Sequence, residues 1–234
     1  EIFQSSGQIA VLPGHGDGTF DTPIVTTITN PSTAGLAADL DGDGFEDLVL
    51  GNYDVSFQIG VFLNLGDGTF GTPDLYPYGH VARPPILAAL HTGGPPDLVI
   101  PSLDASFLEI FPGAGDGTFG APSTVFLDSP PLSVAAADFD EDGNVDLVTA
   151  NQQTSVLFGL GDGLFLPAAV YEIGHGGQWV WTGDYDDNGR ADAAFLSSDG
   201  LSTINVLLNG VLSAKVRDAS LVVGSAAQLS AHAS

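Results

Sequence analysis

The sequence predicts an all-β fold built from repeated units of four antiparallel strands. The turn Gly-Asp-Gly-Thr-Phe ends at Phe20, Phe70 and Phe119, and Gly-Asp-Gly-Leu-Phe ends at Phe165, so the steps are 50, 49 and 46 residues. Between these turns, short apolar runs alternate with segments rich in glycine, proline and aspartate, as is typical of strands joined by tight turns. Four-stranded units at a period of roughly 40–50 residues are typical of the blades of a β-propeller.

Each repeat contains four predicted strands in a fixed order. The first is rich in small residues, which suits an inner strand crowded near a central axis: Ala34–Ala38, Ile86–Ala89, Val134–Ala137 and Trp179–Gly183. The second is apolar: Leu48–Leu50, Leu98–Ile100, Leu147–Ala150 and Ala193–Leu196. The third alternates: Phe57–Leu63, Phe107–Phe111, Ser155–Phe158 and Ile204–Leu208. The fourth is the outermost: Thr22–Thr29, Thr72–Tyr76, Pro122–Phe126 and Pro167–Tyr171.

The two ends of the chain fit into this repeat. By the same spacing, Glu1–Gln4 aligns with a second strand and Gln8–Leu12 with a third. We therefore expect residues 1–212 to form a propeller domain of about five blades, the fifth assembled from both ends of the chain. Residues 213–234 are expected either to supply the closing strands of the last blade or to form a linker to a following domain.

An acidic loop follows the first strand of most repeats. In Asp39–Asp47, aspartates stand at positions one, three, five and nine, and a glycine stands at position six. Asp138–Asp146 repeats the pattern, and Asp184–Asp192 repeats it with Asn188 at position five. Ca²⁺ prefers several oxygen ligands delivered by one tight loop, and this spacing can supply them. The flanking strands, and Leu50 at position twelve in place of a glutamate, distinguish the first loop from an EF-hand.

One loop has lost this pattern. The repeat places a fourth loop at residues 89–97, where only Gly94 and Asp97 remain of the acidic motif. We expect this loop to bind Ca²⁺ poorly or not at all. The aspartates of the Gly-Asp-Gly turns are expected to stabilise the turns themselves, because Asp-Gly is a common turn sequence.

The composition excludes several classes of protein. The net charge is −25 with only four Lys and Arg residues, which argues against nucleic-acid binding and against anionic membrane surfaces. No apolar run approaches the roughly 18 residues of a membrane span, and a hydrophobic content of 44% argues against disorder. The absence of cysteine fits an extracellular protein stabilised by metal ions instead of disulfides.

These residues resemble the FG-GAP/VCBS-type repeat, the calcium-loop propeller unit of integrin α chains and of many secreted bacterial proteins. The resemblance rests on residues 38–48, on residues 137–147 and on the Gly-Asp-Gly-Thr-Phe turns, and it covers residues 1 to about 210. That family usually closes with seven blades, so the alternative to five blades is part of a seven-bladed ring.

The resemblance implies about three Ca²⁺ ions. Their implied side-chain ligands, one set for each ion, are Asp39, Asp41, Asp43 and Asp47; Asp138, Asp140, Asp142 and Asp146; and Asp184, Asp186, Asn188 and Asp192. Phe45, Asn144 and Arg190, at position seven, would each add a backbone carbonyl. The expected role of the ions is structural, because clustered carboxylates repel one another when no cation is bound.

A second group of residues suggests a ligand surface. His80 and His175 occupy equivalent positions between an outer strand and the next inner strand. Nearby residues with aromatic or polar side chains are Tyr78, Arg83, Gln178 and Trp179. Aromatic rings beside polar groups suit a sugar-binding surface. The alternative for Trp179 and Trp181 is a place in the core between blades, and we favour that place for Trp181.

Together, these features predict a secreted or surface-displayed module for binding or adhesion, with a glycan or protein as its ligand. A purely structural protomer or spacer of a larger extracellular assembly is the alternative. A carbohydrate lyase ranks third, since the sequence contains no nucleophile elbow, HExxH motif or phosphate loop. We expect neither nucleic-acid binding nor membrane insertion.

Overall fold

The computed structural model describes residues 2–4, 7–28, 32–52, 57–151, 154–171, 177–197 and 203–209. These residues form 18 strands, which pair into five antiparallel sheets. The first two sheets contain β1 (Ile2–Gln4), β2 (Gln8–Val11) and β3 (Ile24–Thr27), then β4 (Ser32–Ala38), β5 (Asp47–Asn52), β6 (Gln58–Phe62) and β7 (Asp74–Pro77).

The other three sheets follow in chain order. They contain β8 (Ile86–Ala88), β9 (Asp97–Pro101), β10 (Phe107–Phe111) and β11 (Ser123–Phe126); β12 (Ser133–Ala137), β13 (Asp146–Ala150), β14 (Thr154–Leu157) and β15 (Ala169–Tyr171); and β16 (Gly177–Gly183), β17 (Asp192–Ser197) and β18 (Ile204–Leu207). Each strand pairs with its neighbour in the sequence, so every sheet is a simple meander.

The predicted strands are confirmed to within two residues at their ends. The alignment of the N-terminal segment is also confirmed, because β1 pairs with β2 through Ile2 and Val11, and β2 pairs with β3. The first sheet thus has the second, third and fourth strands of a unit. Residues 213–234, for which we expected closing strands or a linker, lie outside the described residues.

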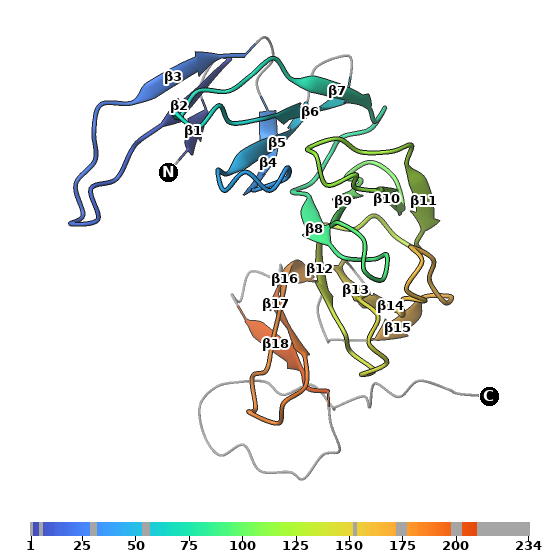
Figure 1. The fold of residues 1–234 in the computed structure, drawn as a ribbon. Coiled ribbons are helices and arrows are strands. Elements are labelled where there is room, and N and C mark those ends of the chain that lie inside the picture. Colours follow the sequence, from blue (N-terminus) through green and yellow to red (C-terminus); the bar gives the residue numbers. More distant parts are fainter. Residues whose placement is uncertain are drawn as a thin grey trace.

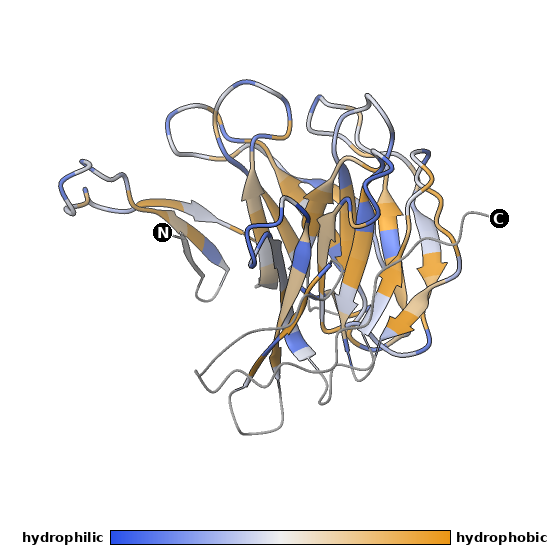
Figure 2. Cartoon of the chain, turned by 90° about the horizontal axis from the view of Figure 1, so that it is seen from below, coloured by the Kyte–Doolittle hydropathy of each residue, from blue (hydrophilic) through white to orange (hydrophobic). Residues whose placement is uncertain are grey.

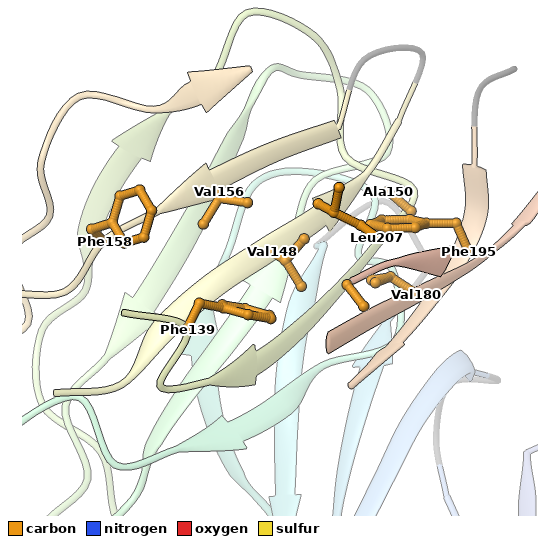
Figure 3. Close-up of a cluster of buried hydrophobic side chains, with 9 residues drawn as sticks. Phe139, Val148, Ala150, Val156, Phe158, Val180, Phe195 and Leu207 are labelled. Carbon is orange, nitrogen blue, oxygen red and sulfur yellow. The ribbon is translucent and has the colours of Figure 1, made fainter. Parts of the chain in front are cut away.

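The core lies between consecutive sheets. Four clusters of buried apolar side chains each join one sheet to the next. In the cluster between the fourth and fifth sheets, Val148 and Val156 pack against Val180 and Phe195 (Figure 3). The middle strands β9 and β13 are buried along their whole length, because both faces of their sheets are covered. Figure 2 shows apolar residues concentrated on the strands and hydrophilic residues on the loops.

The five sheets follow an open arc. Figure 1 shows β1–β3 at one end of the arc and β16–β18 at the other, so the expected closed ring of five blades is not found among the described residues. The part of the chain that the structure describes contains no helix with the length and hydropathy of a membrane span.

The expectation that Trp181 lies in the core between blades is wrong for this structure. The side chain of Trp181 is 50% exposed and that of Trp179 is 39% exposed. Both lie on one face of β16, and Val180 lies on the other face, where it packs against the fourth sheet. No described sheet follows the fifth one to cover the tryptophan face.

Candidate metal centres

The acidic loops connect the first and second strands of three sheets, and two residues of each loop have left-handed backbone conformations. At position six, the φ angles of Gly44, Gly143 and Gly189 are 90°, 89° and 86°. This position requires glycine because a side chain disfavours such angles. Position four is also left-handed, and it carries Gly42, Glu141 and Asp187, with φ angles of 81°, 61° and 57°. The two residues together curl the loop around its own centre.

The curled backbone brings carboxylates together. In each of the three loops, ligand atoms from three aspartates lie within 4.8 Å of one another: Asp39, Asp41 and Asp43; Asp138, Asp140 and Asp146; and Asp184, Asp186 and Asp192. The first aspartate is held in place by the backbone, since the position-six glycine donates its N–H to it at 2.7–3.0 Å in all three loops. Three clustered oxygen donors suit a hard dication such as Ca²⁺.

Positions five and seven are linked locally. Phe45, Asn144 and Arg190 each donate a backbone N–H to the side chain at position five, which belongs to Asp43, Asp142 and Asn188, at 2.8–2.9 Å. These bonds orient the position-five oxygens. Their use as metal ligands, and that of the position-seven carbonyls, remains a prediction.

The aspartate at position nine is a bridge between two parts of its sheet. Asp47, Asp97, Asp146 and Asp192 are all at most 1% exposed. One carboxylate oxygen accepts the N–H of loop position two at 2.8–3.2 Å. The other accepts an N–H at the end of the third strand, from Asn64, Gly113, Gly159 and Asn209 respectively, at 2.7–3.0 Å. This residue therefore has a structural role in each of these four loops, including the degraded one.

Electrostatics inside the loops favour a bound cation. Burial raises the pKa of Asp146 to about 6, and the charges of Asp140 and Asp138 add to the rise, although two backbone N–H groups oppose it. Burial also raises the pKa values of Asp140 and Asp192, again with a contribution from neighbouring aspartates. A cation at the centre of each cluster would relieve this repulsion.

In the degraded loop, a histidine stands beside the bridging aspartate. His91 Nδ1 lies 2.9 Å from Asp97 Oδ2, and among the described residues no cluster of three acidic or histidine ligands includes this loop. The His91 ring also lies under the next hairpin, because a Cβ on Gly163 would stand 2.7 Å from its Cε1. An imidazole thus contacts the bridging aspartate of this loop, where the other loops gather carboxylates, and the weak or absent Ca²⁺ binding of this loop stays a prediction.

The loops also contact the next sheet. The carbonyl of position two accepts a hydrogen bond from the following hairpin in three cases: Leu40 from Gly117 N–H at 3.2 Å, Leu90 from Gly163 N–H at 3.1 Å, and Phe139 from the side-chain amide of Asn209. Position two is the same residue whose N–H binds the bridging aspartate. Ordering of a loop is thereby coupled to the junction between two sheets.

The aspartates of the Gly-Asp-Gly turns act within their turns, as predicted. Asp17 Oδ1 accepts bonds from the N–H and the hydroxyl of Thr19 at 2.9 and 2.6 Å. Asp67 and Asp116 form the same pair of bonds with the threonine two residues later. The threonine hydroxyl, followed by its N–H, lowers the pKa of each of these aspartates.

At the opposite ends of the strands, His80 contributes to a polar patch. Its Nδ1 lies 3.3 Å from Asp104 Oδ1, and its ring meets Phe107 edge-on with 4.8 Å between centroids. Asp104 also accepts the Ser102 hydroxyl at 2.9 Å. Burial opposes ionisation of Asp104, but its hydrogen bonds and the neighbouring histidine outweigh that effect, so its pKa lies below the ordinary value. Burial raises the pKa of Glu109, which lies near the same histidine.

The other predicted ligand residues are dispersed. Tyr78 contacts His80, but it is only 6% exposed and belongs to the core between the second and third sheets. Arg83 donates its backbone N–H to Pro101, and its Nε is buried without a partner among the described residues. Gln178 and Trp179 are exposed on β16 of the fifth sheet, and His175 lies outside the described residues.

Sequence reasoning missed two sets of residues that contact the candidate sites. Asp104 and Phe107 complete the surroundings of His80, but they follow it by more than 20 residues and carry no motif. The partners of the bridging aspartates had a usable signal, because Asn64, Gly113 and Gly159 all stand two residues before a Gly-Asp-Gly turn.

Comparisons with known proteins agree with the architecture. Residues 138–195 match the family described as FG-GAP-like repeat, and this segment includes the second and third acidic loops. No curated protein sequence matches the chain.

Among solved structures, the chain is similar to a lectin of Agrocybe aegerita that recognises non-reducing terminal N-acetylglucosamine. The TM-score is 0.58 at 20% identity, covering 80% of this chain and 55% of the lectin. It is also similar to the BBS1N chain solved in complex with ARL6DN, with a TM-score of 0.56, 12% identity and coverage of 82% and 55%. The third is the biofilm matrix protein Bap1 of V. cholerae, with a TM-score of 0.50, 17% identity and coverage of 86% and 37%.

The chain thus spans about half the length of the first two structures. At these identities the likeness concerns the fold. Residues 138–195 match the FG-GAP-like repeat, and the described part of the chain has a fold similar to that of β-propeller-like proteins.

Proposed function

We propose that this protein is a Ca²⁺-stabilised extracellular module for binding or adhesion, which recognises a glycan or a protein partner. The observation that carries the proposal is the convergence of three carboxylates in each of three acidic loops. The proposal includes a propeller domain over residues 1–212, with residues 213–234 closing the last blade or linking to a further domain.

The donor set favours Ca²⁺ over a transition metal. All side-chain donors in the three clusters are carboxylate oxygens, and neither histidine nor cysteine takes part. Oxygen-only sites suit hard cations, and a flexible loop of this kind suits the larger Ca²⁺ better than Mg²⁺. The complete ligand sets would be those implied by the family resemblance, with oxygens from positions one, three, five and nine and the carbonyl of position seven.

The bound ions would stabilise the contacts between neighbouring sheets. A cation that fixes the loop also fixes position two, whose carbonyl accepts a bond from the next hairpin at Leu40 and Phe139. Extracellular modules bind Ca²⁺ at roughly 10⁻⁴–10⁻³ M, which suits such a structural ion in a calcium-rich medium. The strong negative charge and the lack of cysteine also support an extracellular location.

The polar patch around His80 is the best candidate for ligand contact among the residues predicted from the sequence. The imidazole is partly exposed, and Asp104 and Phe107 fix its position from two sides. An imidazole and carboxylates beside aromatic rings can bind sugar hydroxyls or a polar peptide. The similarity to a lectin and to a biofilm matrix protein supports a role in binding or adhesion.

Two measurements test this function. Thermal denaturation in CaCl₂ and in excess EDTA should show a large loss of stability on chelation, because an ion bound only by the folded state stabilises it by mass action. A glycan array should show binding that His80→Ala abolishes and that Phe126→Ala, an exposed aromatic residue elsewhere, leaves unchanged. Equal binding by both variants would remove the His80 patch from the proposal.

A structural protomer of a larger assembly is the second candidate. It is favoured by one observation, the exposed apolar face of β16–β18. A carbohydrate lyase, the third reading of the sequence, has no specific observation in its favour.

A further inference from the structure

The second and third acidic loops are joined by a buried residue, Asn209. It is 3% exposed, and its side-chain amide donates to the carbonyl of Phe139, at position two of the second loop. Its backbone carbonyl accepts the side-chain amide of Asn188 at 3.1 Å, and its N–H donates to Asp192 at 2.7 Å. One residue therefore binds position two of the second loop and positions five and nine of the third.

These bonds form a continuous path between two carboxylate clusters. Asp146, a member of the second cluster, accepts the N–H of Phe139 at 2.8 Å. The carbonyl of Phe139 binds the side chain of Asn209, whose N–H binds Asp192, a member of the third cluster. The ring of Phe139 is 1% exposed and lies in the core between the fourth and fifth sheets (Figure 3). The path is therefore shielded from solvent at its centre.

A second contact joins the same two loops at the surface. Arg190 Nε, at position seven of the third loop, lies 3.2 Å from Glu141 Oε1, at position four of the second loop. Both side chains are substantially exposed, so solvent screens this ion pair, and we expect it to contribute less than the buried bonds of Asn209.

Asn209 differs from its equivalents in what its side chain contacts. Like Asn64, Gly113 and Gly159, it donates its backbone N–H to the bridging aspartate of its own sheet. The two glycines have no side chain, and the amide of Asn64 donates to the carbonyl of Glu46 within its own sheet at 3.0 Å. Of these four described residues, Asn209 is the one whose side chain binds the loop of the preceding sheet.

The first loop has a different neighbour. The carbonyl of Leu40, at its position two, accepts the N–H of Gly117 from the third sheet at 3.2 Å. The loop of that sheet is the degraded one, which has no carboxylate cluster among the described residues. Within the part of the chain that the structure describes, the hydrogen bonds of the first loop lead to neither of the other two clusters.

We propose that the second and third loops bind Ca²⁺ cooperatively and that Asn209 couples them. The inference rests on the proposed Ca²⁺ binding and adds its regulation. Carboxylates in a loop without a cation repel one another, so each loop becomes ordered when it binds its ion. Because Asn209 contacts both loops, ordering of one loop fixes a hydrogen-bond partner of the other. The second ion then has less of the chain to order, which raises its affinity.

The residues at the two ends of the path fit this role. In the second loop, Asp138 Oδ1 is buried without a hydrogen-bond partner among the described residues, which suits an atom that binds a cation. In the third loop, Asn188 donates its amide nitrogen to Asn209 and accepts the N–H of Arg190 on its amide oxygen at 2.8 Å. Asn209 thus orients the position-five oxygen, which the family resemblance makes a ligand.

The test is a set of Ca²⁺ titrations by isothermal titration calorimetry on chains that keep two loops or one. Asp41→Ala keeps the second and third loops, and adding Asp140→Ala or Asp186→Ala to it leaves a single loop. The coupling factor is the product of the two association constants in the two-loop chain, divided by the product of the constants of the two one-loop chains. It should be about 5 or more, the lower end of typical couplings.

Asn209→Ala isolates the link in the chain that keeps the second and third loops. It removes the amide that binds Phe139 and retains the backbone groups that bind Asn188 and Asp192. The coupling factor should fall to about one, and Glu141→Gln should lower it by less. Circular dichroism checks the fold, and Asn209→Leu, which keeps the volume of the side chain, replaces Asn209→Ala if that variant unfolds.

The matched control is the pair of the first and second loops, retained by Asp186→Ala alone. Its coupling factor should be about one, because the degraded loop separates the two clusters. A factor of one or less for the second and third loops, or a factor that Asn209→Ala leaves unchanged, would overturn this inference and leave the proposed function standing. A wild-type chain that binds no Ca²⁺ would overturn both.

Discussion

Replacing the bridging aspartate of the degraded loop, Asp97→Ala, isolates the structural role of position nine from any role in metal binding. Asp97 is 1% exposed, and its oxygens accept N–H bonds from Leu90 at 3.2 Å and from Gly113 at 3.0 Å. The substitution leaves the N–H of Gly113 without its acceptor, at about 1–3 kcal/mol, whereas the N–H of Leu90 also donates to the carbonyl of Ala88 at 3.0 Å and keeps that partner. The expected loss of about 1–3 kcal/mol is a measurable share of a typical stability of about 5–15 kcal/mol.

The assay is urea denaturation followed by tryptophan fluorescence, in CaCl₂ and in EDTA. For Asp97→Ala the loss should be the same in both media, since we predict no ion in this loop. Asp146→Ala is the matched variant, because it removes the equivalent bonds from Phe139 and Gly159. If Asp146→Ala also removes an ion, the loss of stability should be larger in CaCl₂ than in EDTA. The difference should be about 2.7 kcal/mol at a Ca²⁺ concentration 100-fold above Kd.

Two results would refute this reasoning. A loss below about 1 kcal/mol for Asp97→Ala would mean that water or a shifted backbone satisfies the N–H of Gly113, so that position nine is not a bridge. A cost of Asp146→Ala that is the same with and without Ca²⁺ would separate this aspartate from any metal site.

Three further predictions concern the loops. Asp43→Ala and Asp140→Ala should each reduce the Ca²⁺ bound per chain by one ion, as measured by equilibrium dialysis, because each removes a member of one carboxylate cluster. His91→Ala should leave the number of bound ions unchanged in the same experiment, and loss of an ion would show that the degraded loop binds metal after all. Gly143→Ala should destabilise the protein by about 1–2 kcal/mol in urea denaturation, since its φ is 89°; no atom lies within 4 Å of the added methyl group, so an unchanged midpoint would contradict a purely conformational cost.

Much of the fold could be predicted from the sequence, because the repeat constrains each strand several times. The run Leu98–Ile100 alone is too short to assign, but its equivalents in the other repeats identify it, and it forms the centre of β9. The clustering of Asp39, Asp41 and Asp43 followed from local spacing, since one loop contains all three residues.

Contacts between distant residues were not predictable in the same way. The bridge from Asp47 to Asn64 crosses 17 residues, and the contact of Leu40 with Gly117 joins two sheets. Asn64 and Gly117 do hold fixed places in the repeat, at or near a Gly-Asp-Gly turn, but the repeat alone does not say which residues they contact. The exposure of Trp181 was mispredicted for the same reason, because it depends on which sheet comes next and not on the strand that carries it.

Counting the bound metal tests the central claim most directly. The protein should be stripped with a chelator, dialysed against buffered CaCl₂ well above 10⁻³ M, roughly the weakest affinity of extracellular modules, and its calcium measured by elemental analysis. The three carboxylate clusters predict three Ca²⁺ ions per chain, together with a higher melting temperature than that of the stripped protein. No bound calcium, or a melting temperature that is the same with and without it, would contradict the account.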